Sequence, residues 1–342
     1  MASAPLLLDI KNLHVHFRVY GGRLKVLEGV NFQMRPGEKV GLVGETGCGK
    51  TTTMKAILRV LPVPPAHIPE GEIFFNNQDI LKMSPGLLQR VRGRGISMIF
   101  QDPTAALNPV FSVGEQLESV IQSSTEPDKA LSRQEIHQRA LAALQEVALA
   151  DPARLLKSYP IQLSGGMRQR VCIGMALATR PELLIADEPG TSLDVTIQDQ
   201  VLRLLRKLVE EKGTSVILIT HTLGIVREMT DRVYVMYAGD IVEVAPTKML
   251  FASPLHPYTQ GLISTVPRLT GGGIASGIPG RIPNYLAPPT GCRFHPRCPR
   301  AMEICKKEKP PMYRLDDAHA VACFLYQTEA RDNSGRTGNR AG

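Results

Sequence analysis

The stretch GETGCGKT at residues 44–51 constrains this chain more than any other, because it matches the pattern G-x-x-x-x-G-K-[ST]. The apolar segment EKVGLVG precedes it, and KTTTMKAILRVL, with helical spacing, follows it. Gly44, Gly47 and Gly49 let consecutive backbone N–H groups turn toward one anion, which the dipole of the following helix also attracts. The stretch therefore predicts a phosphate-binding loop between a strand and a helix of an α/β protein.

Several side chains of this loop suit a nucleoside triphosphate. Lys50 supplies a point charge for the β and γ phosphates, the Thr51 hydroxyl can ligate Mg²⁺, and Thr52 can donate near the α phosphate. Cys48 lies inside the loop, and we interpret it as a small filler rather than a redox group. The residues predicted to contact the nucleotide here are Gly44, Glu45, Thr46, Gly47, Cys48, Gly49, Lys50, Thr51 and Thr52.

Two acids end an apolar strand predicted at ELLIADE, residues 182–188. Asp187 and Glu188 then emerge at the carboxyl edge of the strand, where ligands bind in open α/β sheets. Because adjacent strand residues point to opposite faces, they cannot share one role. Asp187 suits the Mg²⁺ shell, and Glu188 suits polarising the water that attacks the γ phosphate. Alone, such a pair is more often a helix cap; downstream of the phosphate loop, the catalytic role is favoured.

Periodicity predicts the rest of an α/β core. The alternation in LHVHF predicts a half-buried strand, and GGR at 21–23 a hairpin turn. Residues 112–149 are helical in character, with Ser132 and Glu135 in capping-box spacing. Further strands are predicted at SVILITH and in RVYVMYAGDIVEVA, a hairpin that turns at Ala238–Asp240.

The composition is that of an ordinary soluble protein. With 342 residues, 43% of them hydrophobic, the chain is long enough for one large core and a smaller appendix. No window approaches 18 uninterrupted apolar residues, and MASAPLLLDIKNLHVHF lacks the basic start of a signal peptide. We therefore expect a cytosolic protein whose thiols stay reduced. The net charge of +8 fits an acidic partner, a phosphate ligand or a membrane surface.

The C-terminal part is dense in Gly and Pro and holds four of the six cysteines. TGGGIASGIPGRIPNYLAPPTG predicts a linker or an extended region, and ARDNSGRTGNRAG a disordered end. Four thiolates can hold a [4Fe–4S] cluster or a structural zinc, although gaps of five, six and seventeen residues include no tight C-x₂₋₄-C pair. Reduced, unliganded thiols are the third interpretation. The cysteines are Cys292, Cys298, Cys305 and Cys323.

Six basic residues accompany these cysteines. We expect them to be solvated side chains that shield a negatively charged cluster, with contact to acidic lipid or nucleic acid as the alternative. Because the segment has few large apolar residues, we also expect a metal group to organise it where a hydrophobic core cannot. The six are Arg293, Arg297, Arg300, Lys306, Lys307 and Lys309.

A second motif brings in a known family. QLSGGMRQRV at 162–171 resembles the signature motif of ATP-binding-cassette (ABC) ATPases, and it lies about 20 residues before the acidic strand, as in that family. The resemblance covers residues 6–260. In it, Gln101 of MIFQDP corresponds to the Q-loop glutamine, SLD at 192–194 to the D-loop, and His221 of LITHT to the switch histidine.

The resemblance implies a P-loop NTPase cassette: a RecA-like α/β core, an N-terminal antiparallel β subdomain and a helical subdomain at about 103–163. It implies active hydrolysis of ATP, with Mg²⁺ held through Thr51, Gln101 and Asp187. It also implies that Phe17, by itself an ordinary strand core residue, stacks on adenine, with Tyr20 in reserve. The implied catalytic residues are Glu188, His221 and Gln101, and the residues that cap the γ phosphate of the opposite subunit are Ser164, Gly165 and Gly166.

Three positions depart from the family pattern. Met167 replaces the commoner glutamine of the signature, Gly190 stands where threonine is usual, and Thr222 stands where aspartate is usual. None of the three is a predicted ligand of phosphate or Mg²⁺. Hydrolysis is therefore still expected, and the departures bear mainly on the contact with the paired subunit.

The tail has a resemblance of its own. SPLHPYTQGLISTVP and GCRFHPRCPRAMEIC resemble the C-terminal extension of oligopeptide and dipeptide importer ATPases, here residues 261–328 before a disordered end at 329–342. Some members of that subfamily are understood to hold an iron–sulfur cluster, which favours [4Fe–4S] over zinc. The resemblance implies a subunit that couples ATP hydrolysis to uptake of di- or oligopeptides, or of nickel, oligosaccharide or another solute.

The implied partners are a second, paralogous ATPase, two transmembrane permease subunits and an extracytoplasmic binding protein, at the cytoplasmic face of the inner membrane. Two rival interpretations remain open. One is a soluble ABC ATPase that acts on DNA or ribosomes, and the other is a metal-containing nucleic-acid module. No nucleic-acid partner is expected.

Overall fold

The computed structural model describes residues 5–125, 130–191, 193–265, 277–316 and 318–329. All but Glu329 of the disordered end predicted at 329–342 lies outside these ranges, as do residues 270–276 of the predicted linker and Ser192 of the SLD motif. The chain divides into two units. The first consists of Met1–Arg35, Lys39–Leu81 and Ile219–Gly342, and the second of Pro36–Glu38 and Lys82–Leu218.

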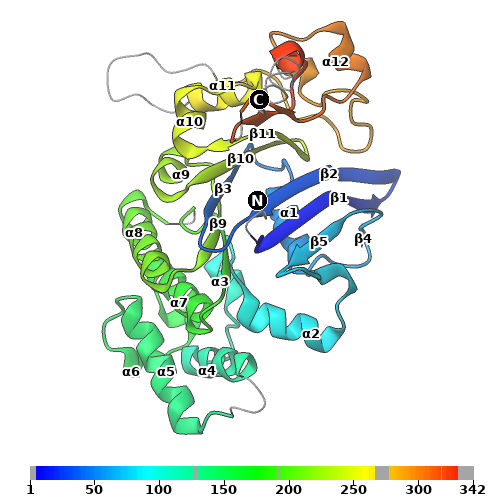
Figure 1. The fold of residues 1–342 in the computed structure, drawn as a ribbon. Coiled ribbons are helices and arrows are strands. Elements are labelled where there is room, and N and C mark those ends of the chain that lie inside the picture. Colours follow the sequence, from blue (N-terminus) through cyan, green and yellow to red (C-terminus); the bar gives the residue numbers. More distant parts are fainter. Residues whose placement is uncertain (1–4, 126–129, 192, 266–276, 317, 330–342) are drawn as a thin grey trace, which may run out of the picture. The chain divides into compact units, whose positions relative to one another are not determined.

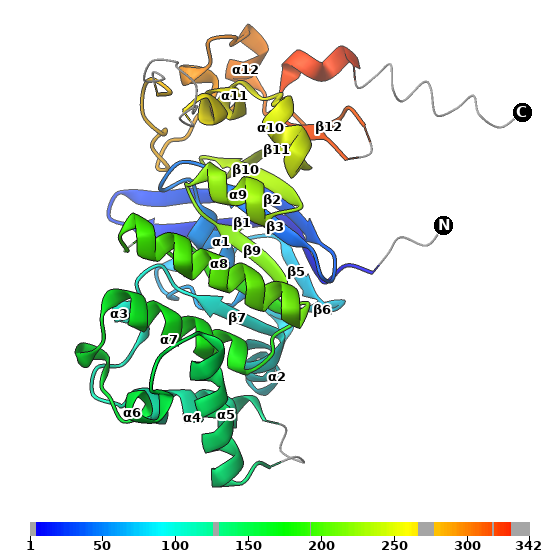
Figure 2. The ribbon, with the colours of Figure 1, turned by 90° about the vertical axis from the view of Figure 1, so that its left-hand side faces the viewer.

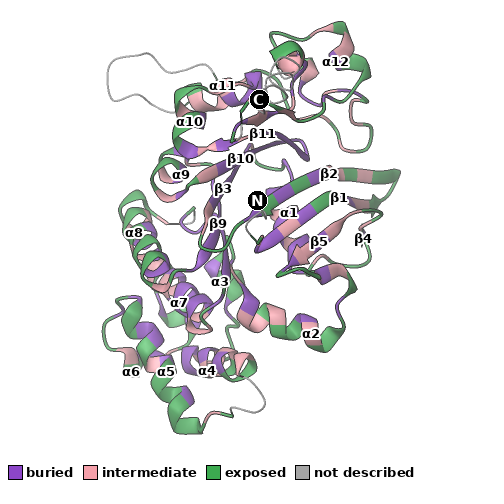
Figure 3. Cartoon of the chain, in the orientation of Figure 1, coloured by how far each residue is buried: buried purple, intermediate pink, exposed green. Residues whose placement is uncertain are grey.

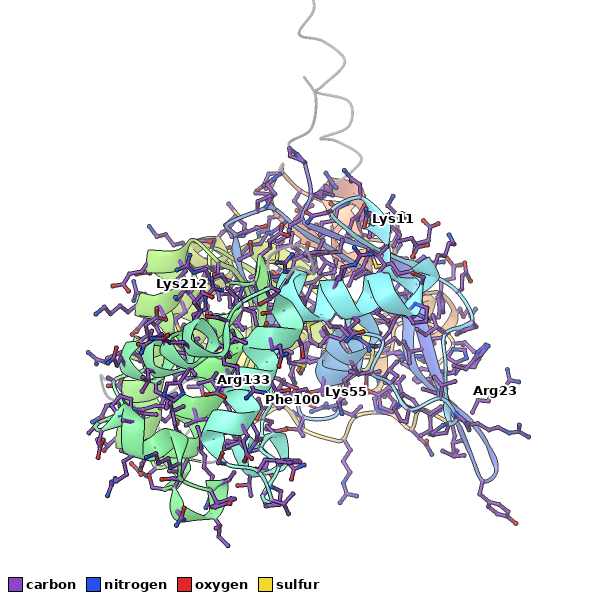
Figure 4. All side chains as sticks on the ribbon, turned by 90° about the horizontal axis from the view of Figure 1, so that it is seen from below. Lys11, Arg23, Lys55, Phe100, Arg133 and Lys212 are labelled. Atoms are coloured by element: carbon purple, nitrogen blue, oxygen red, sulfur yellow. The ribbon has the colours of Figure 1, made fainter. Side chains whose placement is uncertain are left out.

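The first unit contains an antiparallel sheet built on β1 (Leu8–Val19) and β2 (Gly22–Met34). These strands form a hairpin that turns at the predicted GGR, and Arg23 beside the turn points outward (Figure 4). The predicted alternation is confirmed, because Leu13 and Val15 are fully buried. The strand order is β2-β1-β5-β6, and β4 also pairs with β1. The short strands are β4 (Ala66–His67), β5 (Glu72–Phe75) and β6 (Gln78–Asp79).

A second set of strands in this unit carries the phosphate loop. β3 (Lys39–Val43) pairs in parallel with β10 (Arg232–Tyr237), which turns into the antiparallel β11 (Asp240–Pro246), as the sequence predicts. The order is β12-β13-β11-β10-β3. Val40–Val43 and β10 are almost wholly buried, as the purple ribbon in Figure 3 shows. The last strands are β12 (Tyr313–Arg314) and β13 (Ala320–Val321).

Helix α1 (Lys50–Ile57) follows the loop and is shorter than the predicted helical stretch. It ends because Arg59 takes a left-handed φ of 50°, which a helix cannot continue through. Figure 1 shows α10 and α11 close together in this unit. Its other helices are η1 (Ile80–Lys82, reaching the second unit), α9 (Leu223–Met229), α10 (Thr247–Ala252), α11 (Pro257–Ser264), η5 (His295–Arg297), α12 (Glu303–Lys307) and η6 (Phe324–Tyr326).

The core of the first unit continues into the tail. Three buried rings meet there: Tyr237 lies 4.7 Å from Tyr258 and 5.0 Å from Phe294 between ring centroids, and Tyr258 lies 5.5 Å from Phe294. Cys292 and Cys298 pack against the same cluster. The expectation that the tail has no hydrophobic core to organise it is therefore wrong, because Phe294 joins it to the core of the unit.

The second unit contains strands in the order β9-β8-β7, with β7 and β8 parallel. β8 is buried at every position, as expected for a central strand of an α/β sheet. The helix α8 (Val195–Lys212) begins at Asp194, whose side chain accepts from the N–H of Ile197, and ends at Gly213 with φ 63°. The strands are β7 (Ile96–Ile99), β8 (Leu183–Asp187) and β9 (Ser215–Ile219).

The remaining helices of this unit include the predicted helical insertion. Figure 2 shows α4, α5 and α6 gathered beside α7. The capping box predicted at Ser132 and Glu135 is confirmed, and Ser112 and Glu115 form a second one. None of the helices in the described part of the chain has the length and hydrophobicity that crossing a membrane requires. The bounds are α2 (Pro85–Arg90), η2 (Val91–Gly95), α3 (Pro103–Ala106), α4 (Val113–Ser124), α5 (Arg133–Glu146), α6 (Pro152–Leu156), η4 (Pro160–Gln162) and α7 (Gly165–Ala178).

Candidate functional site

The predicted phosphate loop runs from the end of β3 to the start of α1 in the first unit. Gly44 has φ 153°, and a Cβ added there would lie 2.1 Å from the carbonyl oxygen of Met236, so only glycine fits. Gly49 is the N-cap of α1 with φ 109°, and no side chain caps this helix. The first amides of α1 are thus left without a side-chain acceptor, as an anion-binding helix start requires.

Lys50 is folded over the loop. The residue is only 6% exposed, and its Nζ donates to the carbonyl oxygens of Gly44 at 2.7 Å and Glu45 at 3.0 Å. Its Nζ also lies 3.6 Å from the Sγ of Cys48. Burial raises the pKa of the Cys48 thiol, although Lys50 acts in the opposite direction. A neutral, buried thiol agrees with the interpretation of Cys48 as a filler.

Residues from Tyr258 onward in the first unit hydrogen-bond to this loop, and the sequence analysis did not predict these contacts. The Arg297 guanidinium binds the Glu45 carboxylate through two nitrogens, at 2.8 and 3.0 Å. The Tyr258 hydroxyl accepts from the Glu45 N–H at 2.8 Å, and the Tyr285 hydroxyl donates to the Gly47 carbonyl at 2.8 Å. A signal was present in the sequence: an acid in a loop that binds anions needs a cation nearby.

Two of the six basic tail residues are therefore not solvated, contrary to our expectation. The side chains of Arg293 and Arg297 are only 5% and 6% exposed. Arg293 donates to the carbonyl oxygens of Ala238 and Lys25. Fixed hydrogen bonds replace water around both guanidinium groups. The other four basic residues are exposed: Arg300, Lys306, Lys307 and Lys309.

The predicted acids lie in the second unit, at the end of β8. Asp187 is 3% exposed and Glu188 is 9% exposed, with Glu188 at a left-handed φ of 47°. The Oε2 of Glu188 accepts from the Nε2 of Gln101 at 3.1 Å and from the Oγ1 of Thr191 at 2.9 Å. The structure thus brings two of the predicted catalytic residues, Gln101 and Glu188, into direct contact. Thr191 is an additional partner that the motif did not identify.

The signature stretch forms a helix start in the same unit. Ser164 is the exposed N-cap of α7, and its hydroxyl accepts from the N–H of Met167 at 3.3 Å. A Cβ at Gly166 would lie 2.8 Å from Ile197, so this glycine allows α7 to approach α8. The unusual Gly190 has a similar reason, because a Cβ there would lie 2.6 Å from the Cγ of Gln198. The absence of a side chain at residue 190 therefore leaves room for the side chain of Gln198.

The remaining predicted residues are in the first unit. Phe17 is half-buried on β1, opposite Leu24 of β2. Tyr20, the reserve candidate for adenine stacking, is fully exposed at the hairpin turn. His221 is exposed just before α9.

The four tail cysteines converge. They line one small cavity, together with Phe294, Phe324 and Leu325, and none forms a disulfide. Burial raises the pKa of the Cys292 thiol to about 12 and that of Cys323 to about 11, and the neighbouring cysteines add to both effects. Four thiols that line one cavity, two of them buried and two half-buried, are a donor set that would exchange protons for a metal.

The spacing of the donors bears on which group fits. Tetrahedral zinc with bonds of about 2.3 Å holds its sulfurs about 3.8 Å apart. In the described part of the chain, the group of three ligand atoms within 4.8 Å of one another is His14, His16 and Glu28, and no three cysteines meet this condition. In this structure the cysteines therefore do not have the close spacing that a single tetrahedral zinc ion requires.

Comparisons with known proteins agree with this geometry. A family described as "ABC transporter" matches residues 27–191, and one described as "Oligopeptide/dipeptide transporter, C-terminal region" matches residues 242–305. The chain is 44% identical to the dipeptide transport ATP-binding protein DppD of Bacillus subtilis, over 94% of this chain and 96% of DppD. It is 43% identical to the oligopeptide transport ATP-binding protein OppD of that species, over 96% of this chain and 92% of OppD.

Solved structures give the same fold. A dimeric ATP-binding cassette in a post-hydrolysis state, bound to ADP and phosphate, superimposes with a TM-score of 0.62 at 28% identity. The match covers 70% of this chain and 98% of that cassette.

Proposed function

This chain belongs to the ATP-binding proteins of ABC transporters, and from that premise we propose that it drives the uptake of di- or oligopeptides. It has the ABC cassette fold and is an ABC-type ATPase. The observation that carries the peptide assignment is the match to a dipeptide transport protein over 94% of the chain, tail included. The nickel, oligosaccharide and nucleic-acid alternatives have no comparable support.

We propose that the loop at residues 44–52 holds the phosphates of ATP. Lys50 supports this role because its ammonium already lies against the loop carbonyls, from which it can turn to the β and γ phosphates. Phe17 would stack on adenine. Ser164, Gly165 and Gly166, at the exposed start of α7, would cap the ATP of a companion cassette.

Hydrolysis is proposed to use Glu188 as the group that polarises water, with Gln101 and His221 as its partners. The contact between Gln101 and Glu188 supports this, because the amide holds the carboxylate without neutralising it. Bound Mg²⁺ would neutralise phosphate charge. Thr51, Gln101 and Asp187 are its proposed ligands, and the buried, strand-end position of Asp187 suits that role.

Cys292, Cys298, Cys305 and Cys323 are proposed to hold a [4Fe–4S] cluster rather than zinc. Such a group would act here as a structural crosslink of the tail. It is proposed to belong to an extension at residues 261–328 that follows the cassette at 6–260. Within the cassette, the helical subdomain is proposed at about 103–163, and residues 329–342 are proposed as a disordered end.

We propose that the chain works at the cytoplasmic face of the inner membrane, beside two permease subunits, an extracytoplasmic binding protein and a second, paralogous ATPase. A test deletes the gene in its source cell and measures uptake of labelled dipeptide, oligopeptide, nickel and oligosaccharide. The wild-type chain should restore peptide uptake, and Lys50→Ala should not. Restored uptake of only nickel or oligosaccharide would contradict the peptide assignment.

A further inference from the structure

Glu45 is the residue through which the tail reaches the phosphate loop. Its N–H donates to the Tyr258 hydroxyl at 2.8 Å, and its carbonyl accepts from the Cys48 N–H at 3.2 Å and from Lys50 Nζ at 3.0 Å. Its carboxylate accepts from Arg297. Every polar group of Glu45 is therefore engaged, and a shift of Glu45 moves the carbonyl that holds Lys50.

Arg297 is built into this position. Its Nε donates to the Pro279 carbonyl at 2.8 Å, and its two terminal nitrogens reach the Tyr237 hydroxyl at 3.2 Å and the Ile278 carbonyl at 3.0 Å. With the two bonds to Glu45, these make five hydrogen bonds, which equals the number of N–H donors of a guanidinium. Such a fixed fork defines where the Glu45 carboxylate can lie.

The two tyrosines act on the loop backbone. Tyr258 is fully buried in the aromatic cluster, so its hydroxyl is a rigid acceptor for the Glu45 N–H. Tyr285 donates to the Gly47 carbonyl at 2.8 Å and so orients the peptide plane between Gly47 and Cys48. The amide of that plane closes the turn onto the Glu45 carbonyl.

Arg297 also adjoins the cysteine cavity. It ends the short helix η5, and the next residue, Cys298, lines the cavity. The N–H of Arg297 donates to the Phe294 carbonyl and that of Cys298 to the His295 carbonyl, at 3.0 and 3.2 Å. Arg297, which forms the ion pair with Glu45, and Cys298, which lines the cysteine cavity, are thus adjacent residues of one backbone turn.

We propose that Tyr258, Tyr285 and Arg297 are positioning residues that set the geometry of the phosphate loop, and that through Arg297 the state of the cysteine site sets the affinity for ATP. This inference rests on the proposed nucleotide site at residues 44–52. The alternative is that the ion pair between Arg297 and Glu45 only stabilises the fold and does not change how the loop binds phosphate.

A double-mutant cycle on the full-length chain separates these roles. Arg297→Gln and Glu45→Gln should each weaken ATP binding about tenfold. The double variant should bind ATP as well as either single variant, because both substitutions remove the same Arg297–Glu45 interaction. The matched control is Arg293→Gln, an equally buried arginine of the same segment that bonds no residue of the loop, although its guanidinium lies 5.9 Å from the ring of Tyr285. Its effect should add to that of Glu45→Gln.

Steady-state kinetics give the second measurement. Arg297→Gln should raise the KM for ATP about tenfold and keep kcat within about twofold, because the acids of the second unit are untouched. A purely structural role predicts a lower active fraction with an unchanged KM. If Arg297→Gln does not fold, Tyr285→Phe removes only the hydroxyl that donates to Gly47 and should raise KM about threefold. An unchanged KM in the folded variant would overturn the proposal.

The cysteine link has its own test. The wild-type chain is prepared with iron and sulfide reconstituted into it, or stripped of metal, and ATP affinity is measured for both forms by a fluorescent nucleotide. The loaded form should bind about tenfold more tightly, and Arg297→Gln should abolish the difference. An equal difference in the variant, or none in the wild type, refutes the link. If neither wild-type form binds ATP, the proposed nucleotide site itself fails.

Discussion

Glu45 and Glu188 are carboxylates from the two motifs of the proposed ATP site, and they are held in opposite ways. Glu45 pairs with a guanidinium through two nitrogens, at 2.8 and 3.0 Å, so its charge is compensated beside a loop built for anions. Glu188 accepts from the amide of Gln101 and the hydroxyl of Thr191, two neutral donors that orient its carboxylate. This difference supports the proposals that the first carboxylate positions the loop and that the second takes part in the chemistry.

The largest expected effect comes from Glu188→Gln. Glutamine keeps an oxygen that can accept from Gln101 and Thr191, so the fold and ATP binding should be retained. Without the negative charge, turnover should fall about a thousandfold. Phosphate release in the steady state and nucleotide binding measure the two quantities. Glu210→Gln, on an exposed face of α8 where Glu210 pairs with Arg206, is the control and should leave both unchanged. Undiminished phosphate release would contradict the assignment.

Glu45→Gln should lower the stability of the fold more than Glu188→Gln does. It leaves the Arg297 guanidinium, whose side chain is 6% exposed, without its anion. The free energy of unfolding should fall by about 3 kcal/mol, whereas Glu188→Gln should change it by less than about 0.5 kcal/mol. Chemical denaturation of both variants checks this. Equal losses of stability in the two would show that the carboxylates do not differ as we argue.

These two carboxylates also show what a sequence can and cannot predict. Glu188 could be identified because its strand, its position at the strand end and the signature motif are all local patterns, and the same holds for the hairpin at Ala238–Asp240. The pairing of Glu45 with Arg297 joins residues 252 positions apart, and no periodicity encodes it. Likewise, the burial of Phe294 depends on rings from β10 and α11 that meet only in the folded chain.

His256 shows a third way to bury a polar group, which is to keep it neutral. Burial lowers its pKa from 6.5 to about 4, with Glu243 acting in the opposite direction. Below pH 6.5 the unfolded chain takes up a proton that the folded chain refuses, so stability falls as pH falls, down to about pH 4. Between pH 6.5 and 5 the loss should be about 2 kcal/mol.

The control for that prediction is His256→Asn. Asparagine can still cap α11 by accepting from the N–H of Tyr258, as the imidazole does at 3.0 Å, but it does not titrate. Denaturation at several pH values should show a smaller slope for the variant. An unchanged slope would mean that other groups cause the pH dependence.

The smallest expected effect comes from removing one of the neutral hydrogen-bond donors to Glu188. Thr191→Val removes the hydroxyl that donates to Glu188 at 2.9 Å and leaves the 3.1 Å bond from Gln101. Because a hydrogen bond to a charged group contributes about 1.5 kcal/mol, turnover should fall about tenfold, with ATP affinity unchanged. Thr191→Ser restores the donor and should recover most of the rate. If valine and serine at this position give equal rates, the Thr191 hydroxyl is not needed to orient the Glu188 carboxylate, and the prediction fails.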